Sequence, residues 1–169
     1  MLRFNALRLG AVAGLATVLT CGSIATAAAA TPADSQNGTG EKIIRLVATI
    51  RGECTFIDQD NDGEDEPGDQ AVCTDDLARD GVNVGHDGRV CTLLRIEPDG
   101  SGEEQCEITL SLPKGQITVQ GLDEFPAGGT FEYDQAITGG TGEYRAARGY
   151  IHVVVSESQA DLTIHLLSR

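Results

Sequence analysis

The chain has 169 residues, of which 12 are Lys or Arg and 26 are Asp or Glu, so its formal net charge is -14 at pH 7. Contact with a phosphate backbone needs clustered cations, and this excess of acids excludes nucleic acid as a partner. No segment approaches the ~20 consecutive apolar residues of a membrane-spanning helix, so we expect no membrane span.

Residues 1–30 have the layout of a secretory signal peptide. Arg3 and Arg8 precede an apolar run without acids, and a tail of alanines ends before Thr31. This layout predicts cleavage near residue 30 and a secreted, extracellular protein. Lipidation of Cys21 is the alternative, but the threonine before it is larger than such sites usually tolerate. We expect residues 31–41 to be flexible and residues 42–169 to form one domain.

The mature chain keeps four cysteines, an even number that predicts two disulfides in a secreted protein. Cys91 and Cys106 flank a run whose centre, near Pro98 and Asp99, is typical of a hairpin turn. Such a hairpin would place these two cysteines opposite each other. Pairing of Cys54 with Cys73 then follows by elimination.

The mature chain is otherwise a series of short extended runs separated by Gly, Asp and Pro, which is the all-β pattern. We find no helical window of ten or more residues. The first run alternates between apolar and polar side chains, which predicts that its even-numbered residues face the core, Cys54 and Asp58 included. The candidate strands are 42–57, 70–76, 89–97, 104–112, 115–121, 130–138, 144–155 and 161–168.

The last two runs predict a hairpin with one apolar face, formed by Ile151, Val153, Val155, Leu162, Ile164 and Leu166. If this hairpin is symmetric about Ser158 and Gln159, His152 and His165 lie opposite each other on the other face. A cross-strand histidine pair can be half of a zinc site, but the sequence offers no third ligand. Seven or eight strands ending in such a hairpin indicate a closed barrel or a sandwich.

The segment "DQDNDGEDEPGD" is the most acidic part of the chain. Its residues follow the spacing of a calcium-binding loop, with Gly63 at the bend and the ligand candidates Asp58, Asp60, Asp62, Glu64 and Asp69. The last position holds Asp rather than the longer Glu, and the flanks are strands rather than helices. A solvated acidic loop without calcium is the alternative.

The stretch "ITGGTGEYRAARGY" raises the question of a phosphate-binding loop. Such a loop needs a helix after its glycines, yet β-branched residues follow here and no lysine is present. We therefore expect a turn between two strands, in which Gly139, Gly140 and Gly142 allow positive φ or close backbone approach. No GxSxG elbow is present, which argues against a classical hydrolase.

The same stretch resembles the "GGTGxFRxARGYA" motif of plant dirigent proteins and the "AITGGTGxYxGARG" motif of bacterial proteins grouped with allene oxide cyclase. Three further segments follow the order of that family, so that the resemblance spans about residues 44–167: "GDQAVCTDDL", "VGHDGRVCTLL" and "LPKGQITVQGL". The resemblance implies an all-β fold, an eight-stranded antiparallel calycin-like β-barrel with a largely apolar cavity. It also implies a homo-oligomer, a trimer or a dimer.

The resemblance also implies site residues. Asp134 precedes the glycines where some dirigent proteins have a pocket acid, Arg148 matches the "ARG" arginine, and Asp58 falls near an acid at the end of the first strand. We therefore expect Asp58, Asp134 and Arg148 to be catalytic residues. Strand parity, however, points Asp134 outward unless a bulge resets the register. Cys91 matches a cysteine beside the cyclase pocket, a role that a disulfide would remove.

These observations lead to one functional hypothesis and two alternatives. We expect a secreted barrel that binds a small hydrophobic molecule and directs its cyclisation or stereoselective coupling without a cofactor. In this hypothesis a buried Asp58 with a raised pKa exchanges protons, and Arg148 stabilises negative charge or anchors a carboxylate. The alternatives are a non-catalytic carrier and an extracellular calcium-dependent interaction module that uses the loop 58–69.

Overall fold

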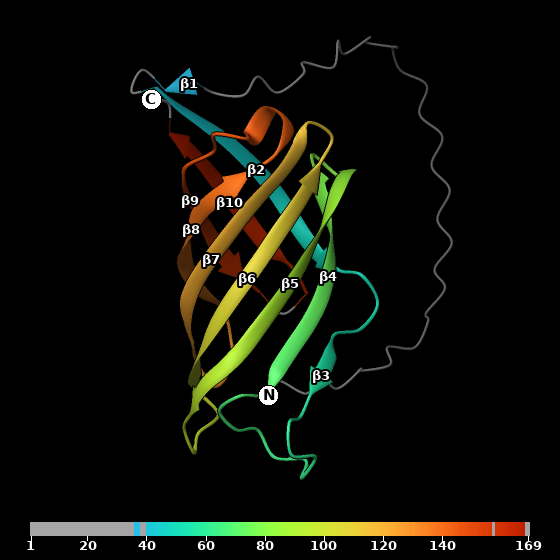
Figure 1. The fold of residues 1–169 in the computed structure, drawn as a ribbon, viewed down its shortest axis with the longest axis vertical. Helices are drawn as coiled ribbons and strands as arrows, with labels where there is room; N and C mark the ends of the chain where they lie inside the picture. The colour runs from blue at the N-terminus through green and yellow to red at the C-terminus, as the bar shows by residue number, and fades with distance from the viewer. Residues whose placement is uncertain (1–35, 38–39, 157, 168–169) are drawn as a thin grey trace, which may run out of the picture. The chain divides into compact units, whose positions relative to one another are not determined.

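The computed structural model describes residues 36–37, 40–156 and 158–167. The expected signal peptide, Cys21 and most of the segment 31–41 therefore lie outside the described residues. Within them, eight antiparallel strands close into a β-barrel, as predicted (Figure 1). The described helical structure consists of η1, a 3-10 helix of three residues, so no described helix is long enough to cross a bilayer.

Most strand bounds follow the predicted runs, and several runs extend at one or both ends. The predicted strand 144–155 is wrong at its start, because Tyr144 belongs to the 3-10 helix η1 and the strand begins only at Gly149. The elements are β1 (Gln36–Asn37), β2 (Glu41–Ile50), β3 (Thr55–Ile57), β4 (Gln70–Arg79), β5 (Val82–Ile96), β6 (Gly102–Leu112), β7 (Gly115–Phe125), β8 (Phe131–Gly140), η1 (Gly142–Tyr144), β9 (Gly149–Val155) and β10 (Ala160–Leu167).

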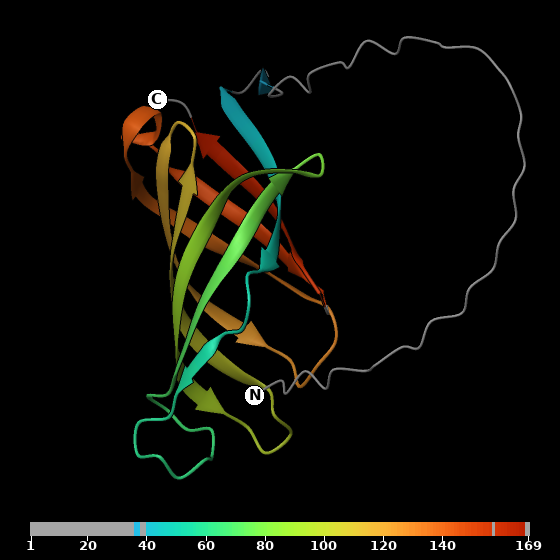
Figure 2. The same cartoon turned by 90° about the vertical axis from the view of Figure 1, so that its right-hand side faces the viewer.

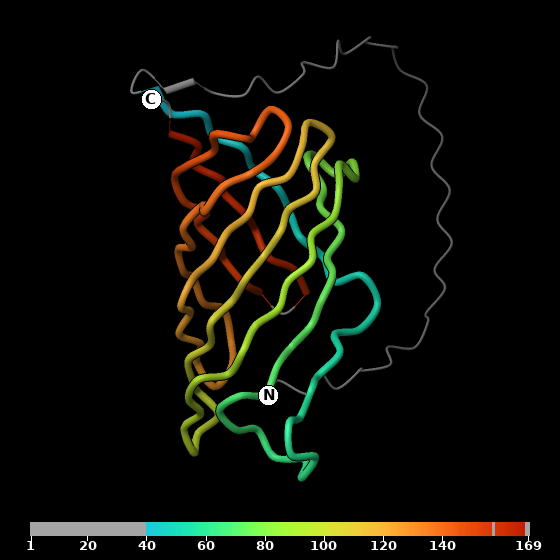
Figure 3. The backbone as a smooth tube through the Cα atoms, viewed as in Figure 1, coloured from blue at the N-terminus to red at the C-terminus, as the bar shows by residue number. Residues whose placement is uncertain are grey.

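The barrel wall consists of β2 and β4–β10. Hydrogen-bonded neighbours follow the order β2-β10-β9-β8-β7-β6-β5-β4, and pairing of β2 with β4 closes the ring. The short strands β1 and β3 extend β2 and β4 beyond the closed ring. The strands tilt strongly around the barrel (Figure 3). The hairpin between β5 and β6 and the acidic loop lie at one end, and η1 lies at the other (Figures 1 and 2).

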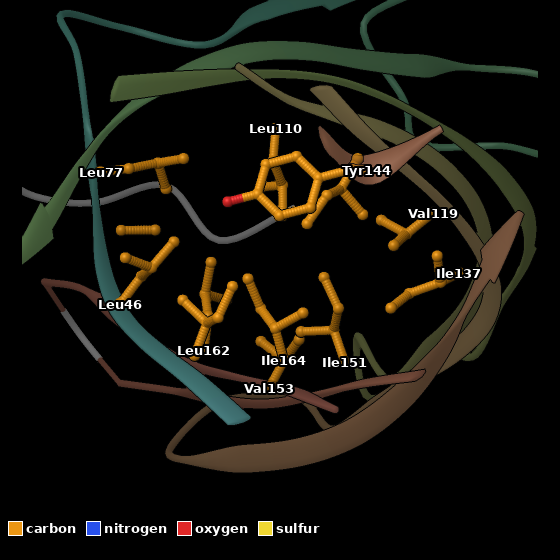
Figure 4. Close-up of a cluster of buried hydrophobic side chains, with 13 residues drawn as sticks. Leu46, Leu77, Leu110, Val119, Ile137, Tyr144, Ile151, Val153, Leu162 and Ile164 are labelled. Atoms are coloured by element: carbon orange, nitrogen blue, oxygen red, sulfur yellow. The ribbon is translucent and has the colours of Figure 1, made fainter. Parts of the chain in front are cut away.

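One part of the interior is an apolar core that the alternating strand pattern creates. Ile44, Leu77, Ile117 and Ile164 are at most 1% exposed. Side chains of the core point toward one another inside the ring of strands (Figure 4). Burial of each such aliphatic side chain stabilises the fold by about 1.5–3 kcal/mol.

The first predicted strand is divided. It ends at Ile50, and a new strand, β3, begins only at Thr55. Gly52, with φ of 82°, lies in the intervening segment, and both strands pair with β4 at different heights. The break resets the register, so the parity of β2 does not extend to Phe56, which is 51% exposed. The prediction that Phe56 faces the core is therefore wrong.

Both predicted disulfides are present. Cys91 and Cys106 are register partners on β5 and β6, and Cys54 bonds to Cys73. The turn between β5 and β6 surrounds Pro98 and Asp99, as expected, and Gly100 N donates to Glu97 O at 2.9 Å. Two disulfides are typical of proteins in an oxidising, extracellular environment.

The glycine-rich stretch turns the chain and also supplies a core residue. A Cβ on Gly140 would lie 2.4 Å from the Gln116 carbonyl oxygen, and Gly142 has φ of 59°. Glycine is required at both positions by close approach or by the left-handed conformation. The turn continues into η1, which places Tyr144 in the core at 8% exposure. The adjacent Arg145 is exposed.

The last hairpin has the predicted apolar face, with Leu162 opposite Val153 and Ile164 opposite Ile151. The predicted histidine pair is wrong. His152 lies opposite Thr163, and His165 lies opposite Tyr150, on whose ring it stacks at 4.3 Å. The turn pairs Val155 with Ala160, so the centre of the hairpin precedes the assumed one and the two histidines do not meet.

Candidate active site inside the barrel

Charged and polar residues occupy a second part of the barrel interior. They lie at positions with the same parity as core residues, so that Asp75 follows Cys73 and precedes Leu77 on β4. On β7, Asp123 continues the inward series of Ile117 and Val119. Seven of the inward polar residues, here called the interior polar cluster, are Asp75, Asp87, Arg89, Glu104, Asp123, Tyr133 and Gln135.

One half of the interior polar cluster is built on β4 and β5. Asp75 and Asp87 are register partners, and Asp87 Oδ1 accepts a hydrogen bond from Asp75 N at 3.1 Å. Arg89 Nη1 donates to Asp75 Oδ2 at 2.7 Å, and the Arg89 side chain is 25% exposed. Solvent therefore reaches the arginine, whereas both carboxyls are nearly enclosed.

Burial changes the proton affinity of both acids. Desolvation raises the pKa of Asp75, although the charge of Arg89 opposes that shift. Desolvation, together with the charge of Asp75, raises the pKa of Asp87 to about 7. Arg89 thus lies beside two neighbouring carboxyls but forms its salt bridge with Asp75, and the carboxyl of Asp87 ionises only near neutral pH.

The other half is built on β6, β7 and β8. Glu104 and Asp123 are register partners, and Gln135 Nε2 donates to Asp123 Oδ2 at 2.5 Å. Desolvation raises the pKa of Asp123 to about 6, against the lowering effect of the Gln135 hydrogen bond. Desolvation and the charge of Asp123 also raise the pKa of Glu104.

Tyr133 connects the two halves. Burial strongly raises the pKa of its hydroxyl, which also feels the charges of Asp123, Arg89, Glu104 and Asp75. Charges from both halves therefore act at one point in the interior. Because it stays protonated at neutral pH, the Tyr133 hydroxyl can donate a hydrogen bond.

Three buried oxygens of the cluster have no hydrogen-bond partner among the described residues. They are Asp75 Oδ1, Asp123 Oδ1 and Gln135 Oε1, in residues that are 1–2% exposed. Leaving such an atom without a partner costs about 1–3 kcal/mol. Gly121 provides the room for this arrangement, since a Cβ there would lie 2.5 Å from Gln135 Cγ.

The cysteines beside the cluster do not supply a nucleophile. A Glu104 oxygen lies within 4.8 Å of the sulfurs of Cys91 and Cys106, but these two cysteines form a disulfide. The role that the resemblance gave to the Cys91 thiol is thereby removed. Proton transfer and electrostatic stabilisation are the chemistry that these carboxyls, the arginine and the tyrosine can supply.

The structure places Asp58 outside the barrel wall, in the loop after β3. Its carboxylate accepts hydrogen bonds from Asn61 N at 2.6 Å and Gly63 N at 2.8 Å. The hydrogen bond from Gly63, the largest cause, lowers the pKa of Asp58. The expectation of a buried Asp58 with a raised pKa is therefore wrong, because the break after β2 removes this residue from the inward series.

Asp134 and Arg148 also lie away from the interior polar cluster. Asp134 is on the outer face of β8, where its side chain is 62% exposed, and its Oδ1 accepts a hydrogen bond from His152 Nδ1 at 2.8 Å. The register shift between β7 and β8 falls near Thr138, beyond Asp134, so it does not turn this residue inward. Arg148 is exposed between η1 and β9. The three expected catalytic residues are not brought together, and their catalytic role stays a prediction.

The acidic loop brings some of its predicted calcium ligands together. Carboxylate oxygens of Asp58, Asp60 and Asp62 lie within 4.8 Å of one another. Asp69 instead accepts hydrogen bonds from Gln59 N at 3.0 Å and from a second loop amide, and it is 5% exposed. Three of the five predicted ligands thus converge, and calcium binding stays a prediction.

Comparison with known proteins places this barrel among related folds. The pattern of the family described as "Allene oxide cyclase barrel like domain" matches residues 58–166. A comparison with curated proteins finds no match. Among solved structures, a pyocyanin demethylase is 29% identical with a TM-score of 0.61, and the alignment covers 73% of this chain and 98% of the demethylase.

Two more distant structures share the fold. An exo-specific intermolecular Diels-Alderase is 17% identical with a TM-score of 0.55, over 75% of this chain and 97% of its own. A pterocarpan synthase dirigent protein is 17% identical with a TM-score of 0.52, over 77% of this chain and 91% of its own. The family pattern covers well over half of the chain and includes β4–β9 together with most of β10. The chain therefore belongs to the allene oxide cyclase barrel-like family.

Proposed function

We propose that this protein is a secreted barrel that binds a small conjugated molecule in its interior and directs the rearrangement, cyclisation or coupling of that molecule by acid–base catalysis. The observation that carries the proposal is the interior polar cluster, in which burial raises the pKa of Asp123 to about 6 and that of Asp87 to about 7. Carboxyls with such values exchange protons efficiently near neutral pH.

The two carboxyls have different surroundings and take different roles. Asp123 accepts a hydrogen bond from Gln135, and its second oxygen has no hydrogen-bond partner among the described residues, so Asp123 is the group that exchanges a proton with the bound molecule. Asp87 lies beside Asp75 and Arg89 and acts as the proton reservoir of the other half. The Arg89 guanidinium and the Tyr133 hydroxyl stabilise negative charge that develops on an oxygen of the bound molecule.

The apolar core completes the proposed site. Carbon skeletons of conjugated molecules are apolar, and the interior continues from the cluster along the same strands to Leu110 and Ile117. Holding a flexible or reactive molecule in one conformation lowers the entropy cost of ring closure or coupling. An interior that is acidic in one part and apolar in the other suits a molecule with one polar edge.

The related structures support a substrate of this kind. The demethylase that is 29% identical acts on pyocyanin by its name, and it is covered over 98% of its length. Pyocyanin is a conjugated heteroaromatic compound and therefore a suitable first probe. The two disulfides support secretion, because they form in oxidising compartments.

The test is turnover of a panel of conjugated small molecules, with pyocyanin first, followed by absorbance and mass spectrometry of the products. We expect product formation by the wild type and a loss of about 100-fold or more in rate for Asp123→Asn. Glu124→Gln is the matched control, because Glu124 is the next residue of β7 and is exposed. Saturable binding without turnover would instead support the carrier, and neither binding nor turnover across the panel would overturn the proposal.

A further inference from the structure

We propose that the interior polar cluster selects a bound molecule that is cationic or that donates hydrogen bonds, such as a protonated amine or an N–H heterocycle, over a carboxylate. This inference rests on the proposed function, because it names the chemical class that the same interior binds. It differs from the role first expected of this barrel, in which an arginine anchors a carboxylate.

The interior polar cluster contains more acids than cations, which is the first reason to expect this selection. Four carboxyls face the interior, from Asp75, Asp87, Glu104 and Asp123, and Arg89 is the only cationic member of the cluster. Arg89 is already bonded to Asp75 at 2.7 Å. A carboxylate entering this interior would add negative charge where acids already outnumber cations, whereas a cation would offset that charge.

The buried atoms of the cluster that have no hydrogen-bond partner among the described residues are the second reason. All three such atoms of the cluster are oxygens that accept hydrogen bonds, namely Asp75 Oδ1, Asp123 Oδ1 and Gln135 Oε1. The orientation of the Gln135 amide group is fixed, because its Nε2 donates a hydrogen bond to Asp123. Its oxygen is therefore left as an acceptor, and a molecule that satisfies these atoms must bring N–H or O–H groups.

The side chains of Asp123 and Gln135 define the position of the donor. Both residues are 1% exposed and both point inward from neighbouring strands, β7 and β8. The hydrogen bond between them leaves one free acceptor on each side chain. An ammonium group brings three N–H donors, enough for both unpaired acceptors, and a ring N–H brings one.

The experiment compares three fluorescent probes that share one naphthalene ring: naphthylmethylammonium, naphthylmethanol and naphthoate. Their affinities for the full-length protein are measured by fluorescence titration at about pH 7.5 and about 0.15 M salt, where surface attraction is largely screened. We expect the ammonium probe to bind about tenfold or more tightly than naphthoate, with the alcohol between them, a difference that corresponds to one charge-assisted hydrogen bond.

Three variants test whether Asp123 and Gln135 cause the preference for the ammonium probe. Asp123→Asn keeps the volume of the side chain and should weaken binding of the ammonium probe by about tenfold, while binding of the alcohol changes much less. Gln135→Met removes the second acceptor and should weaken the ammonium probe as well, which provides a second reading if Asp123→Asn folds poorly. Glu124→Gln removes one exposed acid from the same strand and should leave all three affinities unchanged.

Each other outcome overturns the inference. Naphthoate that binds as tightly as the ammonium probe would show that the interior binds small molecules without the proposed selection, and the proposed function would then stand alone. Equal weakening by Asp123→Asn and Glu124→Gln would assign the attraction to the acidic surface. Absence of binding by all three probes would also contradict the selection, while turnover of the conjugated panel decides the proposed function separately.

Discussion

Asp75 and Asp87 are register partners on neighbouring strands, and the single arginine beside them, Arg89, forms its salt bridge with Asp75. The two carboxyls differ in consequence. The pKa of Asp75 is raised by burial but held back by the arginine, whereas that of Asp87 rises to about 7. Two chemically identical side chains at adjacent positions therefore titrate in different pH ranges.

The raised pKa of Asp87 predicts a pH-dependent gain in stability for Asp87→Asn. The folded protein holds this proton more tightly than the unfolded chain, whose pKa is near 3.8, so the stability of the wild type falls as pH rises from about 4 to about 7. Asparagine cannot ionise and still accepts the bond from Asp75 N. Thermal unfolding should show a higher Tm for the variant at about pH 8, on the order of a few kcal/mol in stability, and little difference near pH 4, where the unfolded chain also holds much of this proton.

The control for this prediction is Glu124→Gln, which removes an exposed acid of β7. We expect no comparable change in its Tm difference between the two pH values. A gain for Asp87→Asn that is constant with pH, or that is larger in acid, would contradict the assignment of the raised pKa to Asp87.

Arg89 is predicted to stabilise the folded protein, because it neutralises the charge of the buried Asp75. Replacement by methionine leaves a carboxyl that is 2% exposed without its cation, and breaking such a pair costs about 3 kcal/mol. Urea unfolding at about pH 7.5 should show this loss for Arg89→Met. The double variant Arg89→Met with Asp75→Asn should recover most of it, because no buried charge remains. Additive losses in the double variant would contradict the pairing.

The barrel could be predicted from the sequence because its strands alternate and its turns carry Gly, Pro and Asp. Cys91 and Cys106 are a clear case, since the hairpin between them fixes their register. The break after Ile50 could not be predicted in the same way. Pairing of both β2 and β3 with β4 is a contact between distant segments, and strand parity cannot be carried across such an interruption.

The interior polar cluster was missed for a different reason. The predicted strands 89–97 and 115–121 leave Asp87 and Asp123 outside, whereas β5 and β7 continue through them. A signal was present: Asp75 and Asp123 have the same parity as their apolar neighbours Leu77 and Val119. An acid in an inward series is costly unless it has a function, so this pattern indicates a site.

The calcium hypothesis for the acidic loop can be tested by calorimetry. Convergence of Asp58, Asp60 and Asp62 predicts a saturable heat on calorimetric titration with calcium. The variant Asp60→Asn with Asp62→Asn should abolish that heat, because two of the three converging carboxylates are lost. Asp99→Asn is the control, since Asp99 lies in the turn between β5 and β6. Absence of heat at millimolar calcium would leave the loop as a solvated acidic segment.

The disulfide between Cys91 and Cys106 is predicted to stabilise the barrel mainly through the unfolded chain. The two residues are 15 positions apart, and closing a loop of this length contributes about 3 kcal/mol. Replacement of both by alanine should lower the midpoint of urea unfolding accordingly. Reduction of the wild type breaks both disulfides and should lower this midpoint at least as far. A double variant as stable as the wild type would show that strand pairing alone fixes this hairpin.

Gly121 is predicted to control the position of Gln135. In Gly121→Ala the new Cβ would lie 2.5 Å from Gln135 Cγ and 3.1 Å from Asp123 Oδ1, so Gln135 must move away from Asp123. Loss of that hydrogen bond removes the effect that lowers the pKa of Asp123, and this pKa should rise above about 6. Titration of the carboxyl carbon by NMR measures the shift directly.

Gly139→Ala provides the matched control for Gly121→Ala. Its Cβ would meet Thr118 Oγ1 at 3.6 Å, an ordinary contact outside the interior polar cluster. We expect the titration of Asp123 to be the same in this variant as in the wild type. Binding of the naphthylmethylammonium probe should weaken in Gly121→Ala and not in Gly139→Ala, because the displaced amide oxygen no longer shares the donor with Asp123. Equal binding by both variants would show that Gln135 does not position the bound molecule.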